Sequence, residues 1–300
     1  MTMTFFARFS FKWAAVATLA CVISCTKNDT TPAVISHEVL VQDFSTSRGT
    51  LRIGGKVYSP KGVESKKPAA ILCHGLFGSY AMMEPYAVAA AQKGFVAVCF
   101  DFCGGPAGES LSGGDVKDNS VLTEIEDVKA VYDALSTRPD VDDGRIVVIG
   151  ASQGGLVAAM YAAQNPARVK ALGLFFPAFN LPEYVKAAVD LLYDGDVNKV
   201  PEEGVGIELD KEKYIFSKKY VLDSYNLDPY KTIGKYTGNV NIIHGDNDIV
   251  VPIEYTRNAL KVYKNAHLDI MEGQGHVFDD AGTQKAAGIL QEWLVEVVKN

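Results

Sequence analysis

The sequence predicts an α/β fold with a mostly parallel central sheet and helices on both of its faces. From Pro68 onward, short apolar runs rich in β-branched residues alternate with longer segments of helical period. This alternation is typical of parallel strands joined by crossover helices. Of the 300 residues, 48% are apolar and 22% are charged, which indicates a globular chain long enough for one large core.

The expected strands are brief and apolar, and the expected helices carry an apolar stripe. A hairpin of residues 37–45 and 50–59, turning near Gly49, is expected to precede the parallel strands. Those strands are expected at residues 69–73, 95–100, 145–149, 169–176, 239–243 and 268–271. The helices are expected at residues 82–93, 124–135, 156–164 and 253–263, with a final one that includes residues 289–297. Residues 34–177 and 237–300 together form the predicted core.

Residues 178–236 interrupt the alternation. They hold seven of the fourteen tyrosines and no clear parallel-strand run. A long segment inserted between two core strands is usually functional. Ligands of open α/β sheets bind at the carboxyl ends of the strands, and this insertion begins at such a strand end. We therefore expect an inserted cap over a binding site. An extra structural lobe remote from the site is the alternative.

The first 24 residues are typical of an export signal. Two basic residues precede an apolar run, residues 13–24, that is too short to span a bilayer core of about 30 Å as a helix. The run ends in Val-Ile-Ser-Cys25, which resembles the lipobox of bacterial lipoproteins. We expect Cys25 to be lipidated after cleavage and residues 25–33 to form a polar tether. Cleavage before Cys21 and a signal without lipidation are the alternatives.

These expectations describe an exported protein held on a bacterial membrane, periplasmic or at the cell surface, by its lipid alone. The net charge of −7 argues against a nucleic-acid partner, because such partners bind basic surfaces. Once Cys21 and Cys25 are assigned to the leader, three of the five cysteines remain and no CxxC pair occurs. This pattern indicates neither a disulfide framework nor a metal site, and we expect no cofactor.

The motif that carries chemistry is Gly150-Ala-Ser-Gln-Gly154. It directly follows an expected strand and directly precedes an expected helix. A serine on such a sharp turn is held in strained backbone geometry above the sheet, and the small residues two positions before and after it avoid clashes between strand and helix. Ser152 is therefore the predicted nucleophile.

A serine hydroxyl needs a histidine base and an acid that orients the imidazole. Four of the five histidines lie in the hairpin or at strand ends: His37, His74, His244 and His267. His276 lies instead in a glycine-rich loop before the last helix, and we predict it as the base. For the acid we prefer Asp248 to Asp246. Asp246 stands directly at the strand exit, where it is well placed to accept the N–H groups of its own turn. The order serine, aspartate, histidine excludes the chymotrypsin and subtilisin arrangements.

Attack by Ser152 on an acyl carbon would create an oxyanion that needs two donors. The N–H of Gln153, at the helix start, is the first. The second is expected from the loop His74-Gly-Leu-Phe-Gly78, where we choose the N–H of Leu76. His74 is then expected to brace this loop.

These motifs, with His74-Gly75, Asp101 and its glycine-rich loop, and Val251-Pro252, resemble the α/β-hydrolase esterases from Pro68 to the C-terminus. The insertion and the Ser-Gln-Gly elbow are similar to those of the cinnamoyl and feruloyl esterases. That resemblance implies an α/β-hydrolase fold and a cap that shapes the acyl pocket. Three tyrosines would then contact an aromatic acyl group, although packing of the cap explains them equally well: Tyr184, Tyr193 and Tyr214. Relatives often carry Arg-Gly-His-Gly after the strand aspartate, whereas this chain has Phe-Cys-Gly-Gly105.

The predicted function is hydrolysis of small-molecule carboxylic esters through an acyl-enzyme. A serine peptidase or aminopeptidase of the same fold is the first alternative, with Glu183, Glu202 or Glu203 as the carboxylate that holds a substrate amine. A non-catalytic binding protein at the cell surface is the second.

Overall fold

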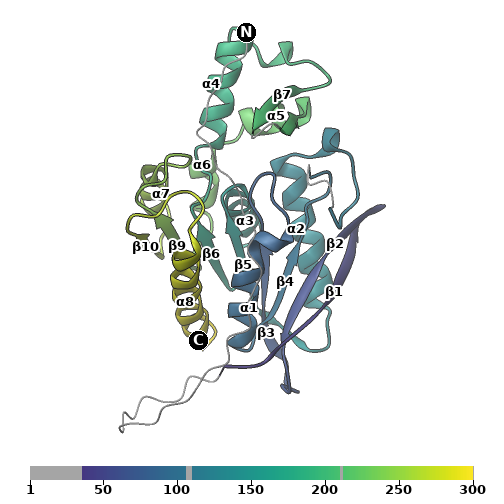
Figure 1. The fold of residues 1–300 in the computed structure, drawn as a ribbon, viewed down its shortest axis with the longest axis vertical. Coiled ribbons are helices and arrows are strands. Elements are labelled where there is room, and N and C mark those ends of the chain that lie inside the picture. The colour runs from purple at the N-terminus through teal and green to yellow at the C-terminus, as the bar shows by residue number, and fades with distance from the viewer. Residues whose placement is uncertain (1–35, 106–109, 210–211, 300) are drawn as a thin grey trace.

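The computed structural model describes residues 36–105, 110–209 and 212–299. Its main sheet has eight strands in the order β1-β2-β4-β3-β5-β6-β9-β10 (Figure 1). The strands are β1 (Val39–Arg48), β2 (Leu51–Pro60), β3 (Lys67–Cys73), β4 (Val96–Phe100), β5 (Val141–Ala151), β6 (Ala171–Phe175), β9 (Asn239–Gly245) and β10 (Ala266–Met271). β2 pairs antiparallel with β1 and β4, and the other neighbours are parallel. This mixed, mostly parallel sheet confirms the predicted fold class.

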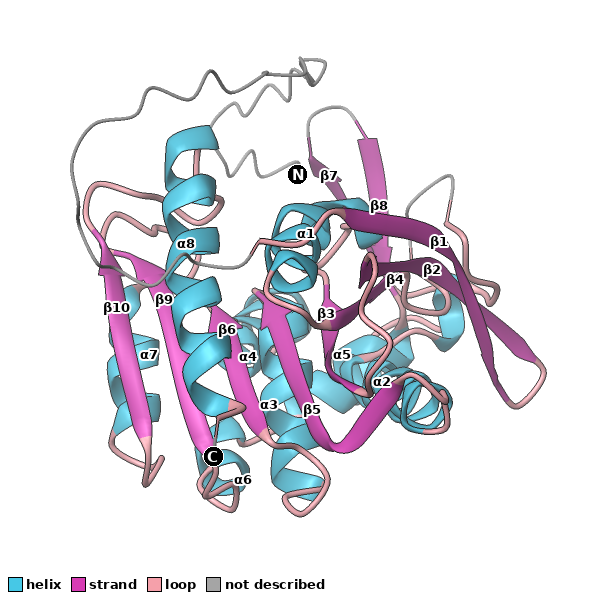
Figure 2. Cartoon of the chain, turned by 90° about the horizontal axis from the view of Figure 1, so that it is seen from below, coloured by secondary structure: helices cyan, strands magenta, loops and turns pink. Residues whose placement is uncertain are grey.

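Helices cover both faces of the sheet. Figure 2 shows α1 (Glu84–Gln92) and α8 (Asp280–Val297) on one face, where they share an apolar cluster with the sheet. The cluster on the other face includes α2 (Val121–Ser136), α3 (Gln153–Gln164) and α7 (Ile253–Leu260). Short 3₁₀ helices are η1 (Tyr80–Met83) and η2 (Val116–Asp118). Because both faces are covered, the central strands read as continuous apolar runs.

Three helices, α2, α3 and α8, begin earlier than their apolar stripes suggest. Ser120 and Thr123 form a reciprocal capping box that starts α2 at Val121, and Asp279 caps α8 by accepting the N–H of Gly282. A stripe marks only the buried face of a helix, whereas the cap decides where it begins.

The segment between β6 and β9 stands above the carboxyl ends of the sheet strands (Figure 1). It contains α4 (Leu181–Tyr193), η3 (Val197–Lys199), β7 (Val205–Leu209), β8 (Glu212–Phe216), α5 (Lys218–Tyr225) and α6 (Pro229–Ile233). A small apolar cluster of its own holds Val189, Val200 and Val221. Ile233 and Tyr236 belong instead to the main core, so the end of this segment is built into the body of the fold. We call residues 178–236 the insertion.

The predicted signal, Cys25 and the whole tether lie outside the described residues and stay predictions. Cys73, Cys99 and Cys103 are buried free thiols. In the part of the chain that the structure describes, no helix is long and apolar enough to cross a membrane. Within the same residues, no group of three or more His, Cys, Asp or Glu side chains is placed to hold a metal ion.

Leu72 lies on the central strand β3 and is fully buried. We expect Leu72→Ala to lower the free energy of unfolding by about 2–5 kcal/mol, because it leaves a cavity between closely packed layers. Leu191→Ala serves as control, since that side chain on α4 is 67% exposed. Urea denaturation measures both variants, and equal losses would contradict the placement of the core.

Candidate active site

Ser152 lies on a sharp turn between β5 and α3. Its backbone has φ 53° and ψ −120°, a left-handed conformation that costs free energy for a residue with a side chain. A Cβ on Gly150 would run into the carbonyl of Gly154, and one on Gly154 would run into the carbonyl oxygens of Cys73 and His74. Both glycines are therefore required by close approach of backbone to backbone, as the motif indicated.

The structure brings the three predicted catalytic side chains into one hydrogen-bonded row. The Oγ of Ser152 lies 2.9 Å from Nε2 of His276, and Nδ1 of His276 lies 2.8 Å from Oδ2 of Asp248. The three residues come from loops at the carboxyl ends of β5, β10 and β9. With Nδ1–H donating to the carboxylate, Nε2 carries the lone pair that can accept the serine proton.

Asp248 is anchored from several sides. Its Oδ1 accepts the N–H groups of Val250 and Val251 at 2.9 and 2.8 Å, and its side chain is fully buried. Burial opposes the charge, but hydrogen bonds from His244 and His276 together with the Val251 N–H outweigh it, and the pKa of Asp248 is well below its usual range. The carboxylate thus stays ionised beside His276.

His244 is a site residue that sequence reasoning missed. Its Nε2 lies 3.2 Å from Oδ2 of Asp248 and 2.9 Å from the carbonyl oxygen of Val251, while Nδ1 lies 2.7 Å from the Thr256 hydroxyl. The ring is fully buried. His244 is therefore a second imidazole in contact with the carboxylate of Asp248. Its only signal in the sequence was its position at a strand end four residues before Asp248.

We had expected Asp246 to accept the N–H groups of its own turn, and this expectation is wrong. Its Oδ1 accepts the N–H of Gly273 at 2.6 Å, in the loop that carries His276. The expected role falls to Asp248, because that side chain turns back over Val250 and Val251. Asp246 thereby ties together the loops that follow β9 and β10.

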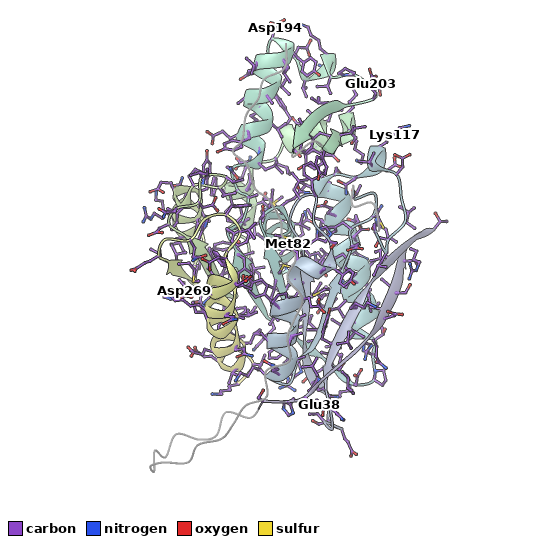
Figure 3. All side chains as sticks on the ribbon, in the orientation of Figure 1. Glu38, Met82, Lys117, Asp194, Glu203 and Asp269 are labelled. Carbon is purple, nitrogen blue, oxygen red and sulfur yellow. The ribbon has the colours of Figure 1, made fainter. Side chains whose placement is uncertain are left out.

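The two predicted oxyanion donors are available. Among the described residues, neither the N–H of Leu76 nor that of Gln153 donates to a protein acceptor. The loop after β3 comes close to the nucleophile, since a Cβ on Gly75 would lie 3.2 Å from the Cβ of Ser152. Met82, near the centre of Figure 3, lies against Gly75 and Gly78 of the same loop.

His74 braces this loop. Its Nδ1 lies 2.8 Å from the carbonyl oxygen of Gly75, and its Nε2 accepts the N–H of Phe102 at 3.3 Å. These partners require a neutral imidazole with the proton on Nδ1. Burial is the main cause that lowers the pKa of His74, and it favours the same neutral form.

The three tyrosines of the predicted pocket lie in different surroundings. Tyr214, on β8, stacks on Phe77 with ring centroids 4.1 Å apart. Phe77 lies in the loop of residues 74–78 after β3, which we call the oxyanion loop. Tyr193 packs on the apolar cluster of the insertion. Tyr184 is 45% exposed on α4. Of these three tyrosines, Tyr214 is the one whose ring contacts a residue next to the site, Phe77.

The depressed pKa of Asp248 has a consequence for stability. The charged form stabilises the fold above the unfolded-state pKa of about 3.9, and this contribution is lost as the pH falls toward the lower folded-state value. Between about pH 5 and pH 3, the wild type should lose more stability than Asp248→Asn, which has no carboxylate to protonate. Urea titrations across this range measure the difference, and parallel losses in the two proteins would contradict it.

Comparisons with known proteins show which chains share this fold and sequence. The chain is similar to Est1E from Butyrivibrio proteoclasticus, whose structure contains ferulic acid. The two structures superimpose with a TM-score of 0.75 and are 25% identical in sequence. The superposition covers 86% of this chain and all of the Est1E chain. The monoacylglycerol lipase ABHD6 of Mus musculus is 22% identical over 274 residues, 80% of this chain and 79% of its own. The α/β-hydrolase domain-containing protein WAV2 of Arabidopsis thaliana is 50% identical, but over 48 residues that make up 16% of each chain.

These similarities support the predicted enzyme class, a carboxylic ester hydrolase. The family model described as "Serine aminopeptidase, S33" (Hydrolase_4) matches residues 64–240, which include the oxyanion loop, the elbow and the whole insertion. The chain has the α/β-hydrolase fold and belongs to this hydrolase family.

Proposed function

We propose that this protein hydrolyses carboxylic esters through an acyl-enzyme formed on Ser152, with small or aromatic acyl groups as substrates. The observation that carries the proposal is the row from Ser152 through His276 to Asp248, with distances of 2.9 and 2.8 Å. Such a row activates a serine, and free backbone N–H groups beside it stabilise a developing oxyanion.

The reaction proceeds in two halves. In the first, Oγ of Ser152 bonds to the acyl carbon while Nε2 of His276 takes its proton, and the N–H groups of Leu76 and Gln153 bind the resulting oxyanion. The intermediate then collapses, and His276 returns the proton to the departing alcohol. In the second half, His276 deprotonates a water that attacks the acyl carbon, and the acid leaves as Ser152 regains its proton. Asp248 orients the imidazole and stabilises its cationic form.

The proposed acyl preference follows from the insertion. The ring of Tyr214 is stacked on Phe77 beside the oxyanion loop, and aromatic surfaces of this kind suit an aromatic acyl group. Est1E, whose structure contains ferulic acid, supports an aromatic acid, and the monoacylglycerol lipase relative supports an ester. The insertion then acts as the cap that selects the acyl group.

An aminopeptidase is the second candidate, because the family model is described as one. It would need a carboxylate of the insertion to bind the substrate amine. Glu202 is paired with Lys218 at 2.5 Å, and Glu203 lies at the outer end of the insertion in Figure 3. Glu183 accepts the hydroxyl of Tyr255 at 2.7 Å and remains available to a cation. A purely binding role is disfavoured, since a complete catalytic row would serve no purpose there.

Ser152→Ala tests the nucleophile. Removing Oγ should lower ester turnover by several orders of magnitude, on the order of a million-fold as in another serine hydrolase. The assay should use acetyl, butyryl, octanoyl and feruloyl esters beside aminoacyl amides, with Ser59→Ala as the matched control in β2, remote from the elbow.

Activity of Ser152→Ala within tenfold of the wild type would show that the assignment is wrong. Rapid turnover of amides by the wild type, with inert esters, would favour the aminopeptidase instead.

A further inference from the structure

The side chain of Gln153 is buried and bonded at both ends. Its Nε2 donates to Oε1 and Oε2 of Glu124 at 2.9 Å each, and its Oε1 accepts the hydroxyl of Tyr220. Asn119 also donates to Glu124, at 3.3 Å. Gln153 is 2% exposed, Glu124 4% and Tyr220 3%. The residue that follows the nucleophile is therefore held by α2 on one side and by α5 of the insertion on the other.

Glu124 is unusual because it is a buried carboxyl whose hydrogen-bond partners are amides. Asp127, one turn further along α2, is paired with Arg48 at 2.6 Å, but among the described residues no cation pairs with Glu124. Burial raises the pKa of Glu124 to about 8, against hydrogen bonds from Gln153 and Asn119 that lower it. A buried carboxyl without a cation costs stability. This cost makes a role in packing alone a poor explanation for Glu124.

We propose that Glu124 and Tyr220 are positioning residues that hold the backbone N–H of Gln153 in the oxyanion hole. This inference rests on the proposed function. The peptide that carries this N–H follows the left-handed backbone of Ser152, a conformation that persists only where the surrounding structure holds it. The Gln153 side chain connects that peptide to two helices, and an oxyanion donor is effective only when it is held in place beforehand.

The arrangement gives the insertion a part in the chemical step. α5 supplies the Tyr220 hydroxyl, which lies on the side of Gln153 opposite Glu124 in the hydrogen-bond chain. A residue that shapes the acyl pocket alters the preference among acyl groups. Loss of a residue that aligns the oxyanion donor lowers kcat for every acyl group by the same factor, because each ester forms the same oxyanion.

Tyr220→Phe, which removes one oxygen, and Glu124→Leu, which removes both oxygens that accept from the Gln153 amide, test the proposal. We expect kcat to fall about tenfold for acetyl and feruloyl esters alike, with KM within twofold. A trifluoromethyl ketone, which adds to Ser152 as an anionic hemiketal, should bind about tenfold more weakly. Because both residues act through Gln153, the double variant should lose less than the product of the single losses.

Tyr236→Phe and Asp127→Asn are the matched controls. The Tyr236 hydroxyl donates to the carbonyl of Val169 at 3.0 Å in the main core, and Asp127 accepts from Arg48 and from the N–H of Cys103. We expect both variants to lower Tm while kcat and ketone affinity stay within twofold of the wild type.

Unchanged kcat and ketone affinity in Tyr220→Phe, with a lowered Tm, would overturn the proposal and leave a structural contact. If Glu124→Leu fails to fold, Tyr220→Phe still tests the proposal. Loss of activity in Ser152→Ala together with full kcat in both network variants would refute this inference alone, whereas an active Ser152→Ala would refute the proposed function.

Discussion

The left-handed backbone of Ser152 is the constraint around which the rest of the site is arranged. Four backbone hydrogen bonds restrain the turn: the N–H of Ser152 donates to the carbonyl of Phe175, and the carbonyl of Ser152 accepts the N–H groups of Gly155, Leu156 and Ala178. The end of β6 and the start of the insertion therefore clamp the elbow. Only glycine at positions 150 and 154 allows strand, helix and oxyanion loop to meet so closely. The strain is local, but its support comes from several elements.

Around this turn, loops from neighbouring parallel strands converge at one edge of the sheet. Each loop is held by polar contacts as well as by apolar packing. Asp248 uses backbone N–H groups and two imidazoles, Asp246 crosses to Gly273, and His74 bridges Gly75 and Phe102. Every one of these bonds removes a degree of freedom before a substrate arrives, which is the condition for effective electrostatic stabilisation of a transition state.

The insertion contacts both halves of the proposed oxyanion hole. Tyr214 stacks on Phe77, the neighbour of Leu76, and Tyr220 donates to Gln153. One tyrosine therefore reaches the loop after β3, and the other reaches the start of α3. Under the proposed function, one segment therefore both selects the acyl group and aligns a donor that stabilises its oxyanion. A substitution at Tyr214 is expected to alter the selection of the acyl group, and one at Tyr220 is expected to alter the alignment of the donor.

The sequence by itself determined the fold class, the elbow and the three side chains that meet in the hydrogen-bonded row. These depend on local features: strand and helix periods, the glycine spacing around Ser152, and a histidine in a glycine-rich loop. Only the tertiary structure decided that His244 joins Asp248, that Asp246 crosses to Gly273, and that Glu124 and Tyr220 hold Gln153. These contacts join residues far apart in the chain or depend on the direction of a buried side chain. No local pattern encodes them, since a buried glutamate in α2 has the same helical period as an exposed one until its neighbours are packed against it.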